Sequence, residues 1–140
     1  MGAYVRVKAA GEAYAVPVDH VLEVAELGQV RAVPGARPEL LGIKSVRGQI
    51  LPVVDLARLL GVHRAAPPVR LLVAEARGFR VGFAIDEVTG IGGLEEPEEL
   101  TEPAPGAESG LLAGATLSDG ELVGVVDVPR VFESLDGTRR

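Results

Sequence analysis

The residues with the clearest potential for chemistry are two aspartates, Asp55 and Asp127, each of which follows a Val-Val pair. Two carboxylates that lie close together share a proton and can act as general acid and general base, as in an aspartic protease. Such a protease needs Asp-Thr/Ser-Gly, but here Leu-Ala follows the first aspartate and Val-Pro the second. An aspartate directly before an apolar segment is typical of a helix N-cap. We therefore predict structural caps at both positions and no catalytic dyad.

Other catalytic or metal-binding groups do not assemble into a recognisable site. His20 and His63 lack metal-ligand spacing, both with each other and with a carboxylate cluster. The serines have no nucleophile-elbow context, and the chain contains no cysteine. We therefore expect no catalytic residue, no metal and no cofactor. A binding protein is the favoured class, and the chain is predicted not to be an enzyme.

The composition restricts the partners that such a protein can have. Its 140 residues are 47% hydrophobic but only 4% aromatic, which predicts an aliphatic core, and the net charge is -6. Nucleic acids and anionic membranes favour clustered lysine and arginine, so neither is expected as a partner. No apolar run approaches the ~20 residues that a membrane helix needs. We expect a cytoplasmic protein without direct membrane insertion.

Two stretches of the chain occur twice. Residues 48–60 (GQILPVVDLARLL) correspond to residues 120–132 (GELVGVVDVPRVF), and residues 14–24 (YAVPVDHVLEV) correspond to residues 81–91 (VGFAIDEVTGI). Two copies are too few for a solenoid, so the repeat predicts two similar lobes packed side by side.

Short alternating strands and glycine turns predict an all-β protein with only brief helices. The duplication refines this prediction to two small β-barrels, with lobes at about 15–65 and 69–125 within a single domain, 1–140. Terminal segments are expected to complete the opposite lobe. Residues 63–68 have the composition of a linker between lobes, and residues 92–110 are expected to form an exposed acidic loop.

A hairpin tip at Arg47-Gly48 offers the best binding candidate. Arginine beside exposed apolar residues is a common hot spot of protein interfaces. Arg47 could instead form an intramolecular ion pair, for example with Glu23. The residues alone do not decide between these two roles.

The order and spacing of several segments resemble the CheW-like family over essentially the whole chain. These are YAVPVDHVLEV, LLGIKSVRGQILPVVDLARLLGV, RLLVAE, VGFAIDEVTGI and LLAGATLSDGELVGVVDV. The most specific part is the Gly-x-x-x-x-Arg-Gly-x-x-x-Pro-Val-x-Asp-Leu core from Gly42 to Leu56. The resemblance implies two five-stranded, SH3-like β-barrel subdomains, in agreement with the duplication.

The resemblance also implies a non-enzymatic adaptor of bacterial chemotaxis, located at receptor arrays on the inner face of the membrane. Its implied partners are the regulatory domain of the histidine kinase CheA and the cytoplasmic tips of methyl-accepting chemoreceptors. Carried over by motif position, the receptor surface comprises Val18, Val21, Glu23 and Arg47. The kinase surface draws on Val88 and Ile91.

The chain departs from the family pattern at Lys44-Ser45, where an apolar residue and asparagine are usual. This change is expected to alter the hairpin or the choice of partner. We expect a free-standing protein, with an excised regulatory domain as the alternative. Two other functions stay open: a CheW-like scaffold of another two-component pathway such as surface motility, and a β-module that binds peptides or small ligands outside signalling.

Overall fold

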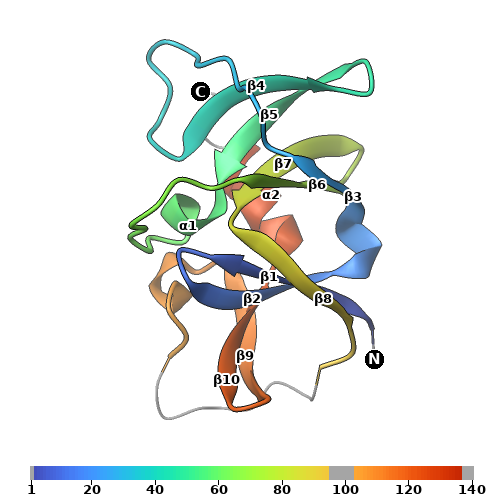
Figure 1. Cartoon of the computed structure of the whole chain (residues 1–140), viewed down its shortest axis with the longest axis vertical. Coiled ribbons are helices and arrows are strands. Elements are labelled where there is room, and N and C mark those ends of the chain that lie inside the picture. The colour runs from blue at the N-terminus through green and yellow to red at the C-terminus, as the bar shows by residue number, and fades with distance from the viewer. Residues whose placement is uncertain (1, 95–102, 137–140) are drawn as a thin grey trace.

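Alternating apolar residues build two five-stranded sheets in the computed structural model, which describes residues 2–94 and 103–136 (Figure 1). Sheet A has the order β8-β1-β2-β10-β9, and sheet B has the order β3-β6-β7-β5-β4. The strands of sheet A are β1 (Tyr4–Ala9), β2 (Glu12–Pro17), β8 (Glu87–Gly92), β9 (Leu112–Ser118) and β10 (Glu121–Val126). Those of sheet B are β3 (Val21–Glu26), β4 (Leu40–Val46), β5 (Gln49–Asp55), β6 (Arg70–Ala76) and β7 (Phe79–Ile85).

The helices are short, as predicted. Two α-helices, α1 (Leu56–Leu59) and α2 (Val128–Asp136), each follow the last strand of a repeat. The 3-10 turns η1 (Val18–His20) and η2 (Ala107–Ser109) complete the elements of the described residues. The predicted class, two five-stranded β-subdomains with few helices, is confirmed.

The internal duplication is visible in the pairing of the strands. In sheet B, β5 pairs in parallel with β7 and places Val53 opposite Gly82. In sheet A, β10 pairs in parallel with β2 and places Val125 opposite Ala15. In the repeat, Val125 corresponds to Val53 and Ala15 corresponds to Gly82. The bulge between β4 and β5 recurs between β9 and β10. The two sheets are therefore equivalent in register as well as in sequence.

The sheets nevertheless divide the chain differently from the predicted lobes of 15–65 and 69–125. Sheet B takes all its strands from residues 21–85, so the expected linker at 63–68 connects two parts of the same sheet. The N-terminal hairpin β1–β2 belongs to sheet A. Each sheet thus combines a hairpin from one repeat with three strands from the other.

The largest apolar core lies between the sheets and is shared by both. It contains residues from β1, β2 and β10 of sheet A, from β5, β6 and β7 of sheet B, and from both α-helices. Its large, fully buried members include Val7, Tyr14, Val16, Leu56, Leu60, Leu72, Phe83 and Ile85. Smaller clusters lie apart from it, around Leu51 and Leu71 in sheet B and around Ala15 and Val123 in sheet A. Because burial of apolar area is the main stabilising contribution, neither sheet is expected to be stable alone.

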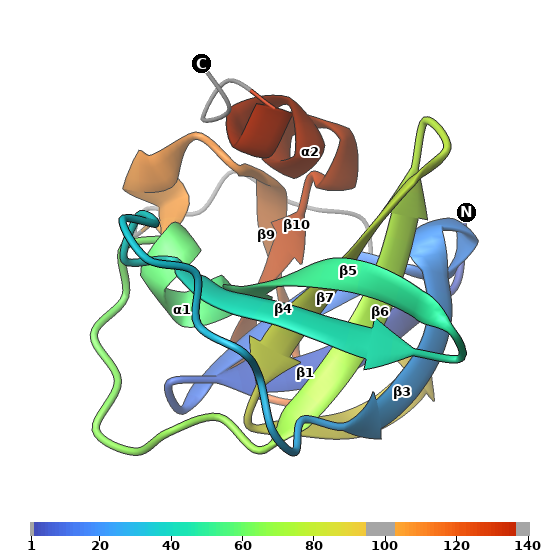
Figure 2. The ribbon, with the colours of Figure 1, turned by 90° about the horizontal axis from the view of Figure 1, so that it is seen from above.

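Figure 2 shows the same arrangement from above, with α2 lying at one side of the molecule. Helix α2 comes from the second repeat but packs near β6 of sheet B, and Arg77 Nη2 donates to Glu133 Oε1 at 2.9 Å. This contact adds to the shared core in tying the two sheets together.

The segment expected to be an exposed acidic loop, 92–110, is in part packed on the core. Its residues 95–102 lie outside the described residues. Farther along, Ala104 is 5% exposed, and the Tyr14 hydroxyl donates a hydrogen bond to the Pro105 carbonyl at 2.6 Å. The expectation of exposure was therefore wrong for Ala104, beside which the buried Tyr14 holds the backbone at Pro105.

Burial of Tyr14 leads to a testable pH dependence. Desolvation by burial, with a smaller contribution from the charge of Glu12, raises the pKa of Tyr14 from 10.0 to about 12. The folded state therefore favours the neutral phenol. We expect the contribution of Tyr14 to the free energy of unfolding to be constant below pH 10. It should fall as the pH rises from 10 towards 12.

Absorbance titration of phenolate in a Tyr4→Phe variant measures this pKa without interference from the other tyrosine. The native midpoint is expected about 2 pH units above that of the same variant in denaturant. Equal midpoints in native and denatured protein would contradict the packing of Tyr14. The Tyr14→Phe variant is the matching control, because its stability should fall less steeply over this pH range.

Candidate protein-docking surfaces

Two of the predicted receptor-binding residues meet in an ion pair. Arg47 lies in the turn between β4 and β5, and its Nε donates to Oε2 of Glu23 on β3 at 2.8 Å. Strands β3 and β4 are the two edges of sheet B, so this pair connects the opposite edges of the sheet. The contact contributes to closing sheet B into a barrel-like shape.

The pair shows that the two roles left open for Arg47 are compatible. The side chain of Arg47 is 80% exposed although it contacts Glu23, whose side chain is 26% exposed. An exposed pair contributes little to stability, typically ~0–1 kcal/mol. Glu23 therefore orients an arginine that stays accessible to a partner.

The predicted apolar neighbours differ in accessibility. Val18 in η1 is 36% exposed, whereas Val21 at the start of β3 is partly buried against the shared core. Two residues that the sequence analysis did not select, Leu22 and Val24, are 46% and 44% exposed on the same strand. The alternating burial of β3 is the signal that identifies them, since successive side chains of a strand point to opposite faces.

The predicted kinase-binding residues lie on β8, at the edge of sheet A. Val88 is partly buried against the shared core, and Ile91 is 74% exposed. In the repeat, these residues correspond to Val21 and Val24 of β3. The two predicted surfaces are therefore equivalent positions of the two sheets.

The charges of the two surfaces differ. Gly90 stands at the position of Glu23, and Asp119 stands at the position of Arg47. Asp119 keeps the positive φ of the turn, 53° against 50° for Arg47, but pairs with Arg6 at 3.7 Å. Of the two surfaces, the one at β3 has a glutamate, Glu23, that orients an arginine, Arg47. A partner can therefore distinguish the two equivalent strands by their charge.

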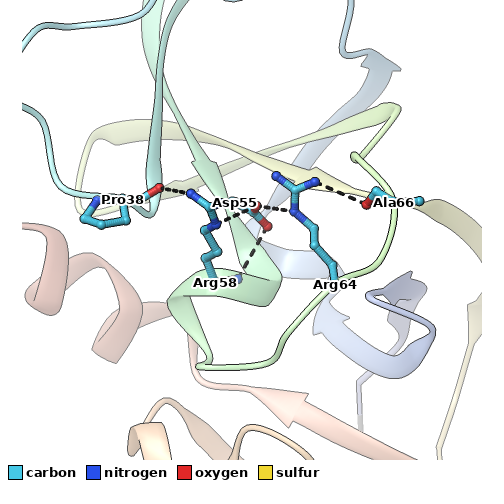
Figure 3. Close-up of polar contacts among 5 residues, drawn as sticks. All are labelled: Pro38, Asp55, Arg58, Arg64 and Ala66. Carbon is cyan, nitrogen blue, oxygen red and sulfur yellow. Dashed lines mark hydrogen bonds and ion pairs between the residues drawn. The ribbon is translucent and has the colours of Figure 1, made fainter.

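Asp55 is the N-cap of α1 and also the buried centre of a polar cluster (Figure 3). Its Oδ1 accepts from the Arg58 backbone N–H at 3.4 Å, and its Oδ2 accepts from Arg64 Nε at 2.6 Å. Arg58 also donates to the Pro38 carbonyl and Arg64 to the Ala66 carbonyl. Arg64 was not predicted as a partner of Asp55, because it belongs to no motif and lies in the segment expected to be a linker.

Asp127 occupies the equivalent position before α2, and within residues 2–94 and 103–136 it has no such cluster. Its Oδ1 accepts from the Arg130 backbone N–H at 3.1 Å, and its side chain is 25% exposed against 1% for Asp55. Each aspartate is thus held by arginines of its own repeat, and the geometry is that of two caps. Among the described residues, no group of three or more His, Cys, Asp or Glu side chains is placed to hold a metal ion.

Comparisons with known proteins agree with this architecture. The model of the CheW-like domain matches residues 3–136. The chain is 30% identical over 128 residues to "Chemotaxis protein CheW" of Thermotoga maritima, covering 89% of this chain and 83% of that protein. It is 33% identical to "Protein FrzA" of Myxococcus xanthus over 65% of this chain and 58% of that protein.

A solved structure has the same fold. The scaffolding protein TtCheW from Thermoanaerobacter tengcongensis superposes with a TM-score of 0.79 at 22% identity, covering 94% of this chain and 87% of that chain. Among the described residues, no helix is long and apolar enough to cross a membrane.

Proposed function

Because this chain belongs to the CheW-like family of non-enzymatic scaffold proteins, we propose that it couples the histidine kinase CheA to the cytoplasmic tips of methyl-accepting chemoreceptors. The observation that carries this proposal is the family match over residues 3–136. In this role the protein works at receptor arrays on the inner face of the membrane.

The proposed receptor surface is the β3 edge of sheet B with the adjoining turn. It combines an oriented arginine, Arg47, with the exposed apolar side chains of Val18, Leu22 and Val24. An arginine beside apolar residues matches the composition of interface hot spots. Glu23 supports this surface by orienting Arg47, and Val21 supports it from the core side.

The proposed kinase surface is the β8 edge of sheet A. Its exposed apolar residue is Ile91, and Val88 anchors the strand to the core. Since Gly90 and Asp119 replace the charged pair of the β3 surface, this edge favours a different partner.

The coupling itself would be mechanical. Residues of both sheets share the large apolar core, and Val21 and Val88, from the two proposed surfaces, both pack against it. Protein interiors are close-packed and transmit displacement with little compression. Receptor helices that press on β3 would therefore change the position of β8 and of the kinase domain bound there.

The variant Arg47→Ala tests the receptor surface. We expect it to weaken binding to a receptor-tip peptide by about 2 kcal/mol, which is roughly 30-fold, because a central arginine of an interface is lost. Its unfolding free energy should change by no more than about 1 kcal/mol, since the pair with Glu23 is exposed. Calorimetric titration and chemical denaturation measure the two effects.

The matched control is Asp119→Ala at the equivalent turn of sheet A, which should retain receptor affinity. Unchanged affinity of the Arg47 variant would remove this residue from the receptor surface.

The proposal as a whole is tested by adding a CheA regulatory domain, and then a receptor-tip peptide, to the isotope-labelled protein in an NMR titration. Shifts at β8 for the first and at β3 for the second are expected. A scaffold of a different two-component pathway is the second candidate, since the relatives of this chain include one that is not named CheW, "Protein FrzA". Binding to the kinase of another pathway, with no binding to a CheA domain, would establish that alternative.

A further inference from the structure

A hollow lies beside β4, between this strand and the segment that follows β3. It is lined by Gln29, Val30, Arg31, Ile43, Lys44, Ser45 and Ile50. The segment before β4 is held there by two backbone hydrogen bonds between Arg31 and Ile43, both 2.9 Å. The hollow thus has a fixed backbone on both sides.

Two cations of this hollow are exceptional among the charges of the protein. Among residues 2–94 and 103–136, each lysine or arginine has a carboxylate oxygen within 4.0 Å except Arg31 and Lys44. These two residues line the same hollow in a chain whose net charge is -6. The hollow is therefore a local cationic site on an acidic protein.

The position of Lys44 is explained by its neighbours. Lys44 pairs across the strands with Leu51, which is 3% exposed, so its aliphatic stem lies beside the apolar interior of sheet B. Its Nζ lies 3.4 Å from the Gln29 carbonyl and close to Gly28, where an added Cβ would be 3.2 Å away. The ammonium group of Lys44 is thereby held at the hollow.

The hollow also offers an apolar contact. Ile50 is 70% exposed and pairs across the strands with Ser45, so both side chains lie on one face. Ile50 lines the same hollow as the two cations, and the three residues together fit a ligand that carries both carboxylates and an apolar side chain.

We propose that this hollow binds an acidic segment of a partner protein that inserts an apolar side chain against Ile50. Arg31 and Lys44 supply the charge complementarity, which selects partners more than it adds affinity. Lys44 is the specificity-determining residue, because an apolar residue at its position would leave only Arg31 to face the carboxylates. The proposal goes beyond the β3 and β8 surfaces and does not depend on which proteins those bind.

The test uses the full chain, isotope-labelled, and two synthetic peptides as probes. One is the capped peptide Glu-Leu-Asp-Glu-Leu-Glu, and the other is its neutral counterpart Gln-Leu-Asn-Gln-Leu-Gln. We expect the acidic peptide to shift the amide signals of residues 29–31, 43–45 and 50, and to bind at least about tenfold more tightly than the neutral one. Raising the salt from about 0.05 M to about 0.5 M should weaken its binding, because exposed charges are screened.

Neutral variants separate the charges. Lys44→Gln and Arg31→Gln should each weaken the acidic peptide about fivefold, whereas Arg77→Gln, which removes an exposed cation outside the hollow, should leave it unchanged. Ile50→Ser should weaken both peptides. No saturable binding, equal binding of both peptides, or shifts outside the hollow would overturn the proposal. Signal changes in the hollow on dilution without peptide would also overturn it, since they would identify a second copy of the chain as the occupant.

Discussion

Replacing Asp55 with alanine is expected to lower the free energy of unfolding by about 3 kcal/mol. The change removes a helix cap, worth ~1 kcal/mol, and a charge-assisted hydrogen bond to Arg64, worth ~1.5–3 kcal/mol. The carboxylate is 1% exposed, so water does not replace these partners in the folded state. Chemical denaturation monitored by circular dichroism measures the loss.

The internal repeat supplies the matched control. Asp127→Ala removes the same kind of cap from α2, but this carboxylate is partly exposed and, in the described part of the chain, has no counterpart of the Arg64 contact. The free energy of unfolding of this variant should fall by about 1 kcal/mol. Equal losses for the two variants would show that the buried cluster around Asp55 adds nothing beyond the cap.

The second large effect is expected for Gly42→Ala. An added Cβ would lie 2.1 Å from the Arg31 carbonyl oxygen and 2.6 Å from its carbon, and both are backbone atoms. In addition, Gly42 has φ +150°, which side chains rarely adopt. Overpacking and backbone strain each cost about 1–3 kcal/mol, so together we expect a loss of about 2–6 kcal/mol. Thermal or chemical unfolding measures it.

The Gly42 variant should also release the segment that carries Arg31. Its two backbone hydrogen bonds to Ile43 hold this segment against β4, and faster amide exchange at Ile43 would report their loss. Gly90→Ala is the control, because an added Cβ there meets no atom within 4 Å. A stability loss at Gly42 no larger than that at Gly90 would contradict the close approach of the two segments.

The sequence predicts part of the proposed docking surfaces but not their full chemistry. The position of Arg47 at a hairpin tip follows from the local Arg-Gly turn. Its ion pair with Glu23 was one of two roles that the sequence left open, the other being contact with a partner protein. The pair depends on the meeting of β3 and β4, the opposite edges of sheet B. Arg64 shows the same limit, because its contact with Asp55 arises from the path of a connecting segment that has no periodic pattern.

What the sequence by itself determined is local: the strands, the glycine turns, the two capped helices and the existence of two equivalent units. These features depend on residues that are close together in the chain. Only the tertiary structure decided that the hairpins β1–β2 and β6–β7 join the strands of the other repeat. The repeats have the same pattern of apolar residues and the same strand register, so each hairpin would satisfy the hydrogen bonds of either copy. The choice between copies depends on how the connections run and on the shared core between the sheets, which no single segment encodes.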